Sequence, residues 1–274
     1  MVRAAVNQVN KTQLAKELGI SRSSLYYQPK RPAIDREVKA QIESVLTDHP
    51  AYGHKRIALE LKLNKKRILR VMKKFGIKPY RRKTKKPVKK ADQGKPASKY
   101  ANLIKKLKIT RPGQVWVTDF TYLKFQSKFL YLATVIDLYT REVVGWNISR
   151  FHNRLLVMGA VLNALETFPP PEIIHSDQGS EYDSADFREL MESLKVAISM
   201  SRKASPWENG HQESFFGHLK AEGGDWARFE TVGQLVEEIS QMIYYYNHQR
   251  IHTALKMPPV KFREKHLTNI KSMP

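Results

Sequence analysis

Cysteine is absent from the 274 residues, which excludes disulfide bonds, thiolate zinc sites and a cysteine nucleophile. The chain also lacks an apolar run of about 18 residues, and its first residues have no apolar centre like that of a signal peptide. We therefore expect a soluble, cytoplasmic protein that does not bind membranes. With 41% hydrophobic and 10% aromatic residues, the chain is long enough for about two domains and a substantial core.

Acidic residues are scarce in the first part of the chain. Residues 1–112 hold 31 Lys and Arg but only 7 Asp and Glu, whereas residues 113–274 hold 17 basic and 19 acidic residues. The whole net charge of +22 therefore lies in the first part. Such self-repulsion does not stabilise a fold, and solubility does not require so uneven a distribution. The asymmetry predicts a polyanionic partner, and double-stranded DNA is the natural one.

Residues 1–30 contain a pattern typical of a helix-turn-helix. Leu14 and Leu18 form an apolar face, Gly19 suits a left-handed turn position, and Ser21 suits the N-cap of a second helix. Together with the local charge, the pattern favours DNA binding over a helical hairpin with no DNA role. The residues expected to face a major groove are Arg22, Ser23 and Tyr26.

Residues 31–77 predict a second basic helical region, with helices over 35–48, 56–61 and 65–75. Asn64 is a suitable cap for the last of these helices, and Gly76 suits its end. Apolar stripes alternate with Lys and Arg, so groove insertion and a solvated basic face explain the charges about equally well. The candidate DNA contacts in this region are Lys65, Lys66 and Arg67.

Residues 78–112 are expected to be a basic linker. Its first part, residues 78–99, has three prolines, many Lys and Arg, and few aliphatic residues, so it cannot bury a core. The candidate phosphate contacts in this segment are Arg81, Arg82, Lys83, Lys85 and Lys86.

Residues 113–274 predict a catalytic domain of the α/β class. An antiparallel meander over 114–125, 128–137 and 142–149 is indicated by alternating β-branched and aromatic residues. Two further short strands are expected at 172–175 and 196–200. Helices are expected over 155–168, 184–194, 209–222 and 231–248. The result is a mixed five-stranded sheet flanked by helices.

Three acidic residues in this part indicate a functional site when they are considered together. Asp119 lies inside a strand among apolar residues, where a charge is costly unless a cation or hydrogen bonds compensate it. Asp177 directly follows an apolar strand, the place where ligands collect in α/β sheets. Glu213 lies on a predicted helix, and Lys220, almost two turns later, shares its helix face. Each acid alone also suits an ordinary surface or turn position.

The chain resembles the catalytic core of retroviral integrases and bacterial insertion-sequence transposases, the DDE superfamily with a ribonuclease-H-like fold. The resemblance is closest to the IS-three group of transposases and rests on five ordered phrases: AYGHKRIALEL, WVTDFTYL, HSDQGSEY, WENGHQESFFGHLK and YNHQRIHTALKMPP. It implies that Asp119, Asp177 and Glu213 are catalytic and hold two Mg²⁺ ions, which Mn²⁺ can replace. It also implies that Lys220 lies near DNA.

The resemblance further implies transposon ends and target DNA as partners, a homodimer or larger oligomer on DNA, and a location at the bacterial nucleoid. The physics agrees, because two Mg²⁺ ions suit an in-line displacement at a phosphodiester. The alternative is a DNA-binding protein without catalysis, such as a repressor or an inactive remnant of the element. A carboxylate-pair hydrolase acting on sugars does not explain the basic half.

Several polar residues are open to two interpretations. Asn209 precedes the helix that carries Glu213, where backbone amides suit a phosphate, yet a simple helix start explains it nearly as well. His175 is expected to orient the loop of Asp177 by hydrogen bonding rather than to bind metal. The stretch from Tyr244 to Arg250 suits contacts with DNA or another subunit, or packing of the last predicted helix on the core.

Overall fold

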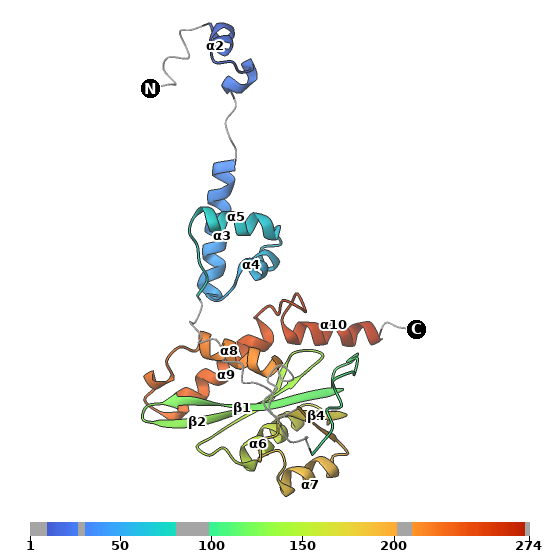
Figure 1. Ribbon diagram of the computed structural model, residues 1–274. Helices are drawn as coiled ribbons and strands as arrows, with labels where there is room; N and C mark the ends of the chain where they lie inside the picture. The colour runs from blue at the N-terminus through green and yellow to red at the C-terminus, as the bar shows by residue number, and fades with distance from the viewer. Residues whose placement is uncertain (1–9, 27–30, 81–98, 202–209, 272–274) are drawn as a thin grey trace, which may run out of the picture.

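The computed structural model describes residues 10–26, 31–80, 99–201 and 210–271. A helical region precedes a sheet that is covered by helices on both faces (Figure 1). The strands are β1 (Val115–Phe125), β2 (Lys128–Asp137), β3 (Val143–Ser149), β4 (Ile173–Ser176) and β5 (Ala197–Met200). The α-helices are α2 (Lys11–Glu17), α3 (Arg31–Asp48), α4 (His54–Glu60), α5 (Lys65–Lys74), α6 (Arg154–Leu165), α7 (Ala185–Ser193), α8 (Gly210–Glu222), α9 (Val232–His248) and α10 (Pro259–Lys271).

The sheet has the strand order β3-β2-β1-β4-β5, which confirms the predicted mixed five-stranded sheet. β1, β2 and β3 form the predicted antiparallel meander, while β4 is parallel to both β1 and β5. β1 pairs with β2 from Trp116 to Phe125, but it pairs with β4 only from Val115 to Val117. Beyond Val117, the second edge of β1 therefore has no described strand beside it.

Alternation along β1 sends its side chains into two separate cores. Val117 and Leu123 pack among residues of α8 and α9 on one face, whereas Trp116 packs among residues of α6 and α7 on the other. Close packing of α6 on β3 depends on Gly145, since an added Cβ would lie 2.3 Å from the carbonyl oxygen of Ala160. The sheet that carries the candidate acids is therefore held rigidly from both sides.

The helices α3, α4 and α5 enclose a third core, which includes Ile42, Ile57 and Ile68. The predicted ends of α5 are confirmed: the backbone N–H of Lys66 donates to Asn64 Oδ1 at 2.8 Å, and Gly76 has a φ of +66°. This helical unit has an apolar interior of its own, which explains why its Lys and Arg residues lie mostly at the surface.

The helical unit contacts the end of α9 and the residues that follow it. The backbone N–H of Ile251 donates to the Tyr52 hydroxyl at 2.7 Å, and Ile251 joins the third core. His49 Nδ1 lies 2.7 Å from the Tyr245 hydroxyl. Deeper in the α/β domain, Asn247 exchanges two hydrogen bonds of 2.9 Å with the backbone of Val143. The aromatic stretch near the C-terminus therefore packs on the core in part, since Tyr246 and Asn247 are buried whereas Tyr244 is 56% exposed.

The N-terminal pattern is confirmed in its turn but not in the regularity of its second helix. Gly19 has a φ of +64°, and the Ser21 hydroxyl accepts the backbone N–H of Ser24 at 3.3 Å. The second helix is a 3₁₀ helix over Arg22–Tyr26 rather than an α-helix over the described residues. Serine hydroxyls compete for backbone groups, and Ser21 Oγ lies 2.8 Å from the hydroxyls of both Ser23 and Ser24.

The last part of the predicted linker packs on the α/β domain. Ile104, Leu107 and Ile109 contact the core beneath α8 and α9, and the backbone N–H of Leu103 donates to Ser199 Oγ at 2.9 Å. The stretch cannot be a free linker there, because apolar residues recur among its lysines and bury against the sheet domain. The predicted contacts Arg81, Arg82, Lys83, Lys85 and Lys86 lie outside the described residues.

Helix α10 is an element that the sequence patterns did not predict. It packs against α9, and Arg263 Nε donates to Glu142 Oε2 at 2.7 Å. Its sequence has few apolar residues among many charged ones, so it has no clear helical pattern. Its position depends on tertiary contacts. Across the described residues, no helix is both long and apolar enough to cross a membrane.

Candidate active site

The three predicted acids lie on elements that meet at one end of the interior strands β1 and β4. Asp119 is half-buried on β1, two residues beyond the pairing with β4. Asp177 directly follows β4, and since β1 and β4 are parallel, both residues lie toward the same end of the sheet. Glu213 lies in the first turn of α8, which packs on β1.

Electrostatics ties Asp119 to both other acids. Burial, the negative charge of Asp177 and, to a smaller extent, that of Glu213 together raise the pKa of Asp119 from 3.8 to about 7. One hydrogen bond, from the backbone N–H of Phe120 at 2.8 Å, opposes the shift. Within the described chain, no Lys or Arg forms an ion pair with Asp119. Among the described residues, the buried carboxyl of Asp119 therefore has no neutralising cation beside it.

The loop of Asp177 contains a fourth carboxylate that the sequence analysis did not single out. Burial raises the pKa of Asp177, and the charge of Glu181 raises it further, while the backbone N–H of Gly179 donates to Asp177 Oδ1 at 3.0 Å. Glu181 is only 8% exposed, and its Oε1 lies 3.0 Å from His152 Nδ1. Its position four residues after Asp177 in HSDQGSEY was the available signal.

A buried tyrosine lies beneath the acids. Tyr182 is fully buried, and its hydroxyl lies 3.4 Å from the hydroxyl of Thr118. Burial raises the pKa of Tyr182 well above its usual value, and the charge of Asp119 adds to this effect. Tyr182 therefore remains a neutral phenol, which keeps further negative charge out of the site.

The helix that carries Glu213 is attached to the sheet by its neighbour Gln212. This side chain is completely buried, and its Nε2 donates to the carbonyl oxygens of Val117 at 2.8 Å and Thr134 at 3.1 Å. Its Oε1 accepts the Thr134 hydroxyl at 2.9 Å. Gln212 was not predicted, although a polar residue in a buried stripe with Phe215 was a sign of a buried polar contact.

Lys220 lies on the same side of α8 as Glu213, and its Nζ lies 4.4 Å from the ring centroid of Tyr122. Among the other predicted DNA contacts, Arg22, Ser23, Lys65 and Lys66 are exposed and Arg67 is half-buried. The side chain of Tyr26 and the whole of Asn209 lie outside the described residues. His175 is fully buried with Nδ1 2.9 Å from Ser199 Oγ, in line with its predicted hydrogen-bonding role.

The three candidate donors have the chemistry of a metal site, but they are not gathered around one point. In the described part of the chain, no group of three His, Asp or Glu side chains is already gathered closely enough to hold one. Like charges repel, so three carboxylates do not converge fully by themselves. All three candidate donors are carboxylate oxygens, however, and burial with two neighbouring acids makes the ionised form of Asp119 costly, which suits a hard dication such as Mg²⁺.

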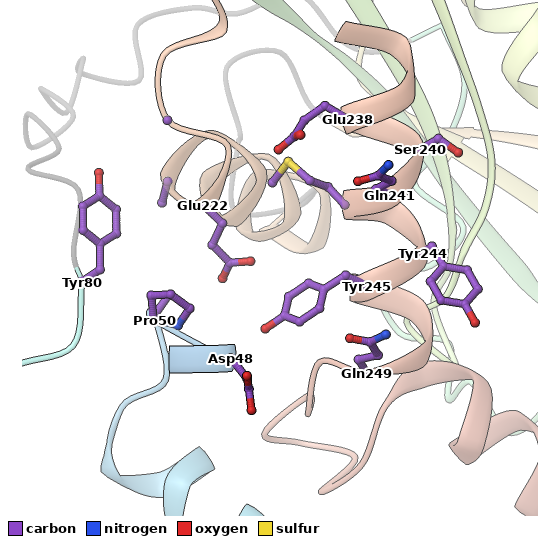
Figure 2. A pocket seen from close by; sticks show the side chains of 14 residues that line it. Asp48, Pro50, Tyr80, Glu222, Glu238, Ser240, Gln241, Tyr244, Tyr245 and Gln249 are labelled. Carbon is purple, nitrogen blue, oxygen red and sulfur yellow. The ribbon is translucent and has the colours of Figure 1, made fainter. Parts of the chain in front are cut away.

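A cavity of about 840 Å³ lies elsewhere, between the helical unit and α8 and α9 (Figure 2). Three carboxylates contribute to its lining, and they disfavour a phosphate ligand. Its charged and aromatic lining residues are Asp48, Glu222, Glu238, Tyr80, Tyr244 and Tyr245.

Comparisons with known proteins agree with the fold. Two models of the integrase core domain match residues 109–206 and 213–267. The transposase for insertion sequence element IS904 of Lactococcus lactis is 33% identical over 253 residues, which cover 88% of this chain and 99% of that protein. The putative transposase InsK for insertion sequence element IS150 of Escherichia coli is 29% identical and covers 92% of this chain. That alignment spans 93% of InsK.

Among solved structures, a chain of the simian T-cell lymphotropic virus intasome superposes with a TM-score of 0.51 at 15% identity. It covers 81% of this chain and 74% of that one, and it supports the fold alone. The ribonuclease-H-like sheet and the integrase core matches define a DDE-type polynucleotidyl transferase. On its similarity over most of its length, the chain belongs to the insertion-sequence transposases.

Proposed function

We propose that the protein cleaves and joins DNA strands at the ends of an insertion sequence, with Asp119, Asp177 and Glu213 as its catalytic residues. The observation that supports the proposal is that the charges of Asp177, after β4, and Glu213, on α8, both raise the pKa of Asp119 on β1. Each carboxylate comes from a different element, and the electrostatic coupling through Asp119 is costly for the fold unless a cation binds there.

These three residues would hold two Mg²⁺ ions, and Mn²⁺ would substitute. When bound, the ions would activate the attacking oxygen and stabilise the leaving oxygen of an in-line displacement. Asp119, on its rigid strand, would contribute to holding both ions, with Asp177 and Glu213 each mainly holding one. Water would attack first and free a 3′-hydroxyl, and this hydroxyl would then attack a phosphodiester of the target DNA.

The basic residues would bind the DNA that the acids act on. Lys220, on the same side of α8 as Glu213, would neutralise a phosphate close to the reacting group. Two DNA ends must be held together for transposition, so we expect a dimer or larger assembly on DNA. The more distant contacts would come from Arg22, Ser23, Tyr26, Lys65, Lys66, Arg67, Arg81, Arg82, Lys83, Lys85, Lys86 and Asn209.

The test uses a supercoiled plasmid that carries the terminal sequences flanking the coding region. With Mg²⁺, the parent should nick it, whereas Asp119→Asn, Asp177→Asn and Glu213→Gln should each lose activity by at least a hundredfold and still bind the DNA. Glu237→Gln, an exposed acid on α9, is the matched control and should cut like the parent.

The non-catalytic alternative makes the opposite prediction. A repressor or inactive remnant would bind the plasmid but nick it no faster than Asp119→Asn does. If all three acid-to-amide variants cut like the parent, the assignment of the triad is wrong even though the protein is a nuclease. Affinity for the DNA should also fall steeply with salt, because phosphate contacts release counterions.

A further inference from the structure

We propose that Tyr122 and Phe129, together with Lys220, form a stacking platform for unpaired bases of the DNA strand beside the reacting phosphate. The proposal rests on the proposed function, since it assigns a binding site for the same substrate. Both aromatic residues belong to the β1–β2 hairpin, and Lys220 comes from α8.

Both rings are unusually exposed for large apolar side chains on a regular sheet. Tyr122 is 60% and Phe129 is 51% exposed, and their ring centroids lie 5.5 Å apart at an interplanar angle of 88°. An edge-to-face pair of this kind leaves ring faces open to solvent. Exposed apolar surface that is grouped rather than scattered marks an interaction site.

The pair continues toward the acids as a strip of rings. In the β1–β2 register, Tyr122 is opposite Tyr131, and strand alternation places Phe120 on the same face. The ring centroids of Phe120 and Tyr131 lie 6.4 Å apart, and His152 stacks on Phe120 at 6.0 Å. His152 in turn contacts Glu181 in the loop of Asp177. The strip of rings therefore begins beside the loop that carries Asp177 and ends at Tyr122 and Phe129.

Lys220 adds a cation at the exposed end of the strip. Its Nζ lies 4.4 Å from the Tyr122 ring centroid, so it crosses the edge of β1 that has no described strand beside it. A cation over one ring suits the phosphate of a nucleotide whose base stacks on a neighbouring ring. A purely apolar partner would gain nothing from this charge.

The spacing fits a DNA strand bound at the acids. Asp119 and Tyr122 are three residues apart on β1, which is about 10 Å at roughly 3.3 Å per residue. That length corresponds to about three base steps of 3.4 Å. Their side chains leave opposite faces of the sheet, so a DNA strand would pass around the edge of β1 that has no described strand beside it to reach both. Bases next to a reacting phosphate must leave the helical stack if the phosphate is to reach a recessed site. An aromatic surface compensates for the lost stacking without selecting a sequence.

The experiment measures binding of a dT₁₂ oligonucleotide with one central 2-aminopurine to the full chain, without Mg²⁺. We expect the parent to quench the 2-aminopurine fluorescence. Tyr122→Ala and Phe129→Ala should each bind the oligonucleotide at least about tenfold more weakly than the parent. Binding to a blunt duplex should change less than twofold. Phe129→Trp should restore the affinity, and Leu267→Ala, which removes an exposed apolar side chain on α10, should leave it unchanged.

Three results would overturn the platform. One is dT₁₂ affinity and quenching in both alanine variants equal to those of the parent. Another is an equal loss of duplex binding, which would indicate a general phosphate contact. The third is a shift from dimer to monomer in sedimentation without loss of dT₁₂ binding, which would assign the rings to a second copy of the chain.

The outcome is separable from that of the proposed function. Asp119→Asn should retain normal dT₁₂ binding and quenching while losing DNA cleavage. A parent that shows ring-dependent quenching but cuts no DNA would support the platform and refute the catalysis. A parent that cuts DNA and binds dT₁₂ independently of both rings would support the catalysis and refute the platform.

Discussion

The side-chain amide of Gln212 donates to the carbonyl oxygen of Val117 at 2.8 Å, and so joins the two elements that carry Asp119 and Glu213. Gln212 immediately precedes Glu213, and Val117 lies two residues before Asp119 on β1. A single buried residue thus sets the distance between the strand and the helix of the candidate site. Because the group is fully buried, a residue without the amide loses these hydrogen bonds at a position where water cannot replace them.

We predict that Gln212→Met leaves the protein folded but slows DNA cleavage. Loss of the hydrogen bonds should reduce the free energy of unfolding by about 1–3 kcal/mol, while a small displacement of Glu213 should slow cleavage by about tenfold to a hundredfold. The Mg²⁺ concentration for half-maximal rate should rise as well. Gln241→Met, at an exposed position of α9, is the control. Unchanged Mg²⁺ dependence with reduced stability would limit Gln212 to a structural role.

The raised pKa of Asp119 predicts how the stability of the metal-free protein depends on pH. Its pKa is 3.8 in the unfolded chain and about 7 in the fold, so the folded state binds more protons between these values. The contribution of Asp119 is therefore fully retained below pH 3.8 and is lost as the pH rises through about 7.

Thermal melting of Asp119→Asn at several pH values measures this effect. The variant should melt like the parent near pH 4 and at a higher temperature than the parent at pH 8, by about 2–4 °C for each kcal/mol recovered. Added Mg²⁺ should reduce the difference, because it stabilises the parent. Glu192→Gln, on the exposed side of α7, should show no such pH dependence. A difference that does not vary with pH would argue against the raised pKa.

Docking of the helical unit on the catalytic domain should depend on Tyr52. Tyr52→Phe removes the hydroxyl that accepts the Ile251 backbone N–H at 2.7 Å and leaves that buried donor without its partner. We expect a loss of about 1–3 kcal/mol in the free energy of unfolding. Hydrogen exchange at the Ile251 amide should accelerate. Tyr80→Phe, at an exposed tyrosine, should leave both quantities unchanged. Slow exchange retained in Tyr52→Phe would contradict the assignment.

The buried carboxylate of Asp35 should control the stability of the helical unit. Hydrogen bonds from Arg70 at 2.6 and 2.9 Å and from Lys74 at 2.8 Å hold its pKa well below the usual range. Its stabilising effect is therefore present above its unfolded pKa and is lost as acid protonates it.

Thermal melting of the full chain, followed by far-UV circular dichroism, measures the effect of Asp35→Asn on stability. The variant should melt earlier than the parent at pH 7, and the difference should shrink on acidification. Glu43→Gln removes the exposed pair with Lys39 at 3.3 Å and should change little, because a surface pair contributes little. Equal effects of the two substitutions would show that burial of Asp35 is unimportant.

Most elements of the fold could be predicted, because their patterns are local. The period-two alternation predicted β1, β2 and β3 within one residue of their observed bounds, and capping residues such as Asn64 predicted helix starts. Helix α10 and the 3₁₀ form of Arg22–Tyr26 were missed, since neither has a clear local signal. The three acids were found through their spacing and their phrases, whereas Glu181 and Gln212 were not. Their importance depends on contacts with residues far away in the chain.

The amino-acid order by itself determined the positions of the strands, the uneven charge and the identity of the three candidate acids, because all of these are local or compositional properties. Only the tertiary structure decided that Gln212 connects α8 to β1, that β1 extends beyond its pairing with β4, and that Tyr122 and Phe129 remain exposed beside Lys220. Burial and proximity arise when distant segments pack together, and no local pattern records which segments those will be.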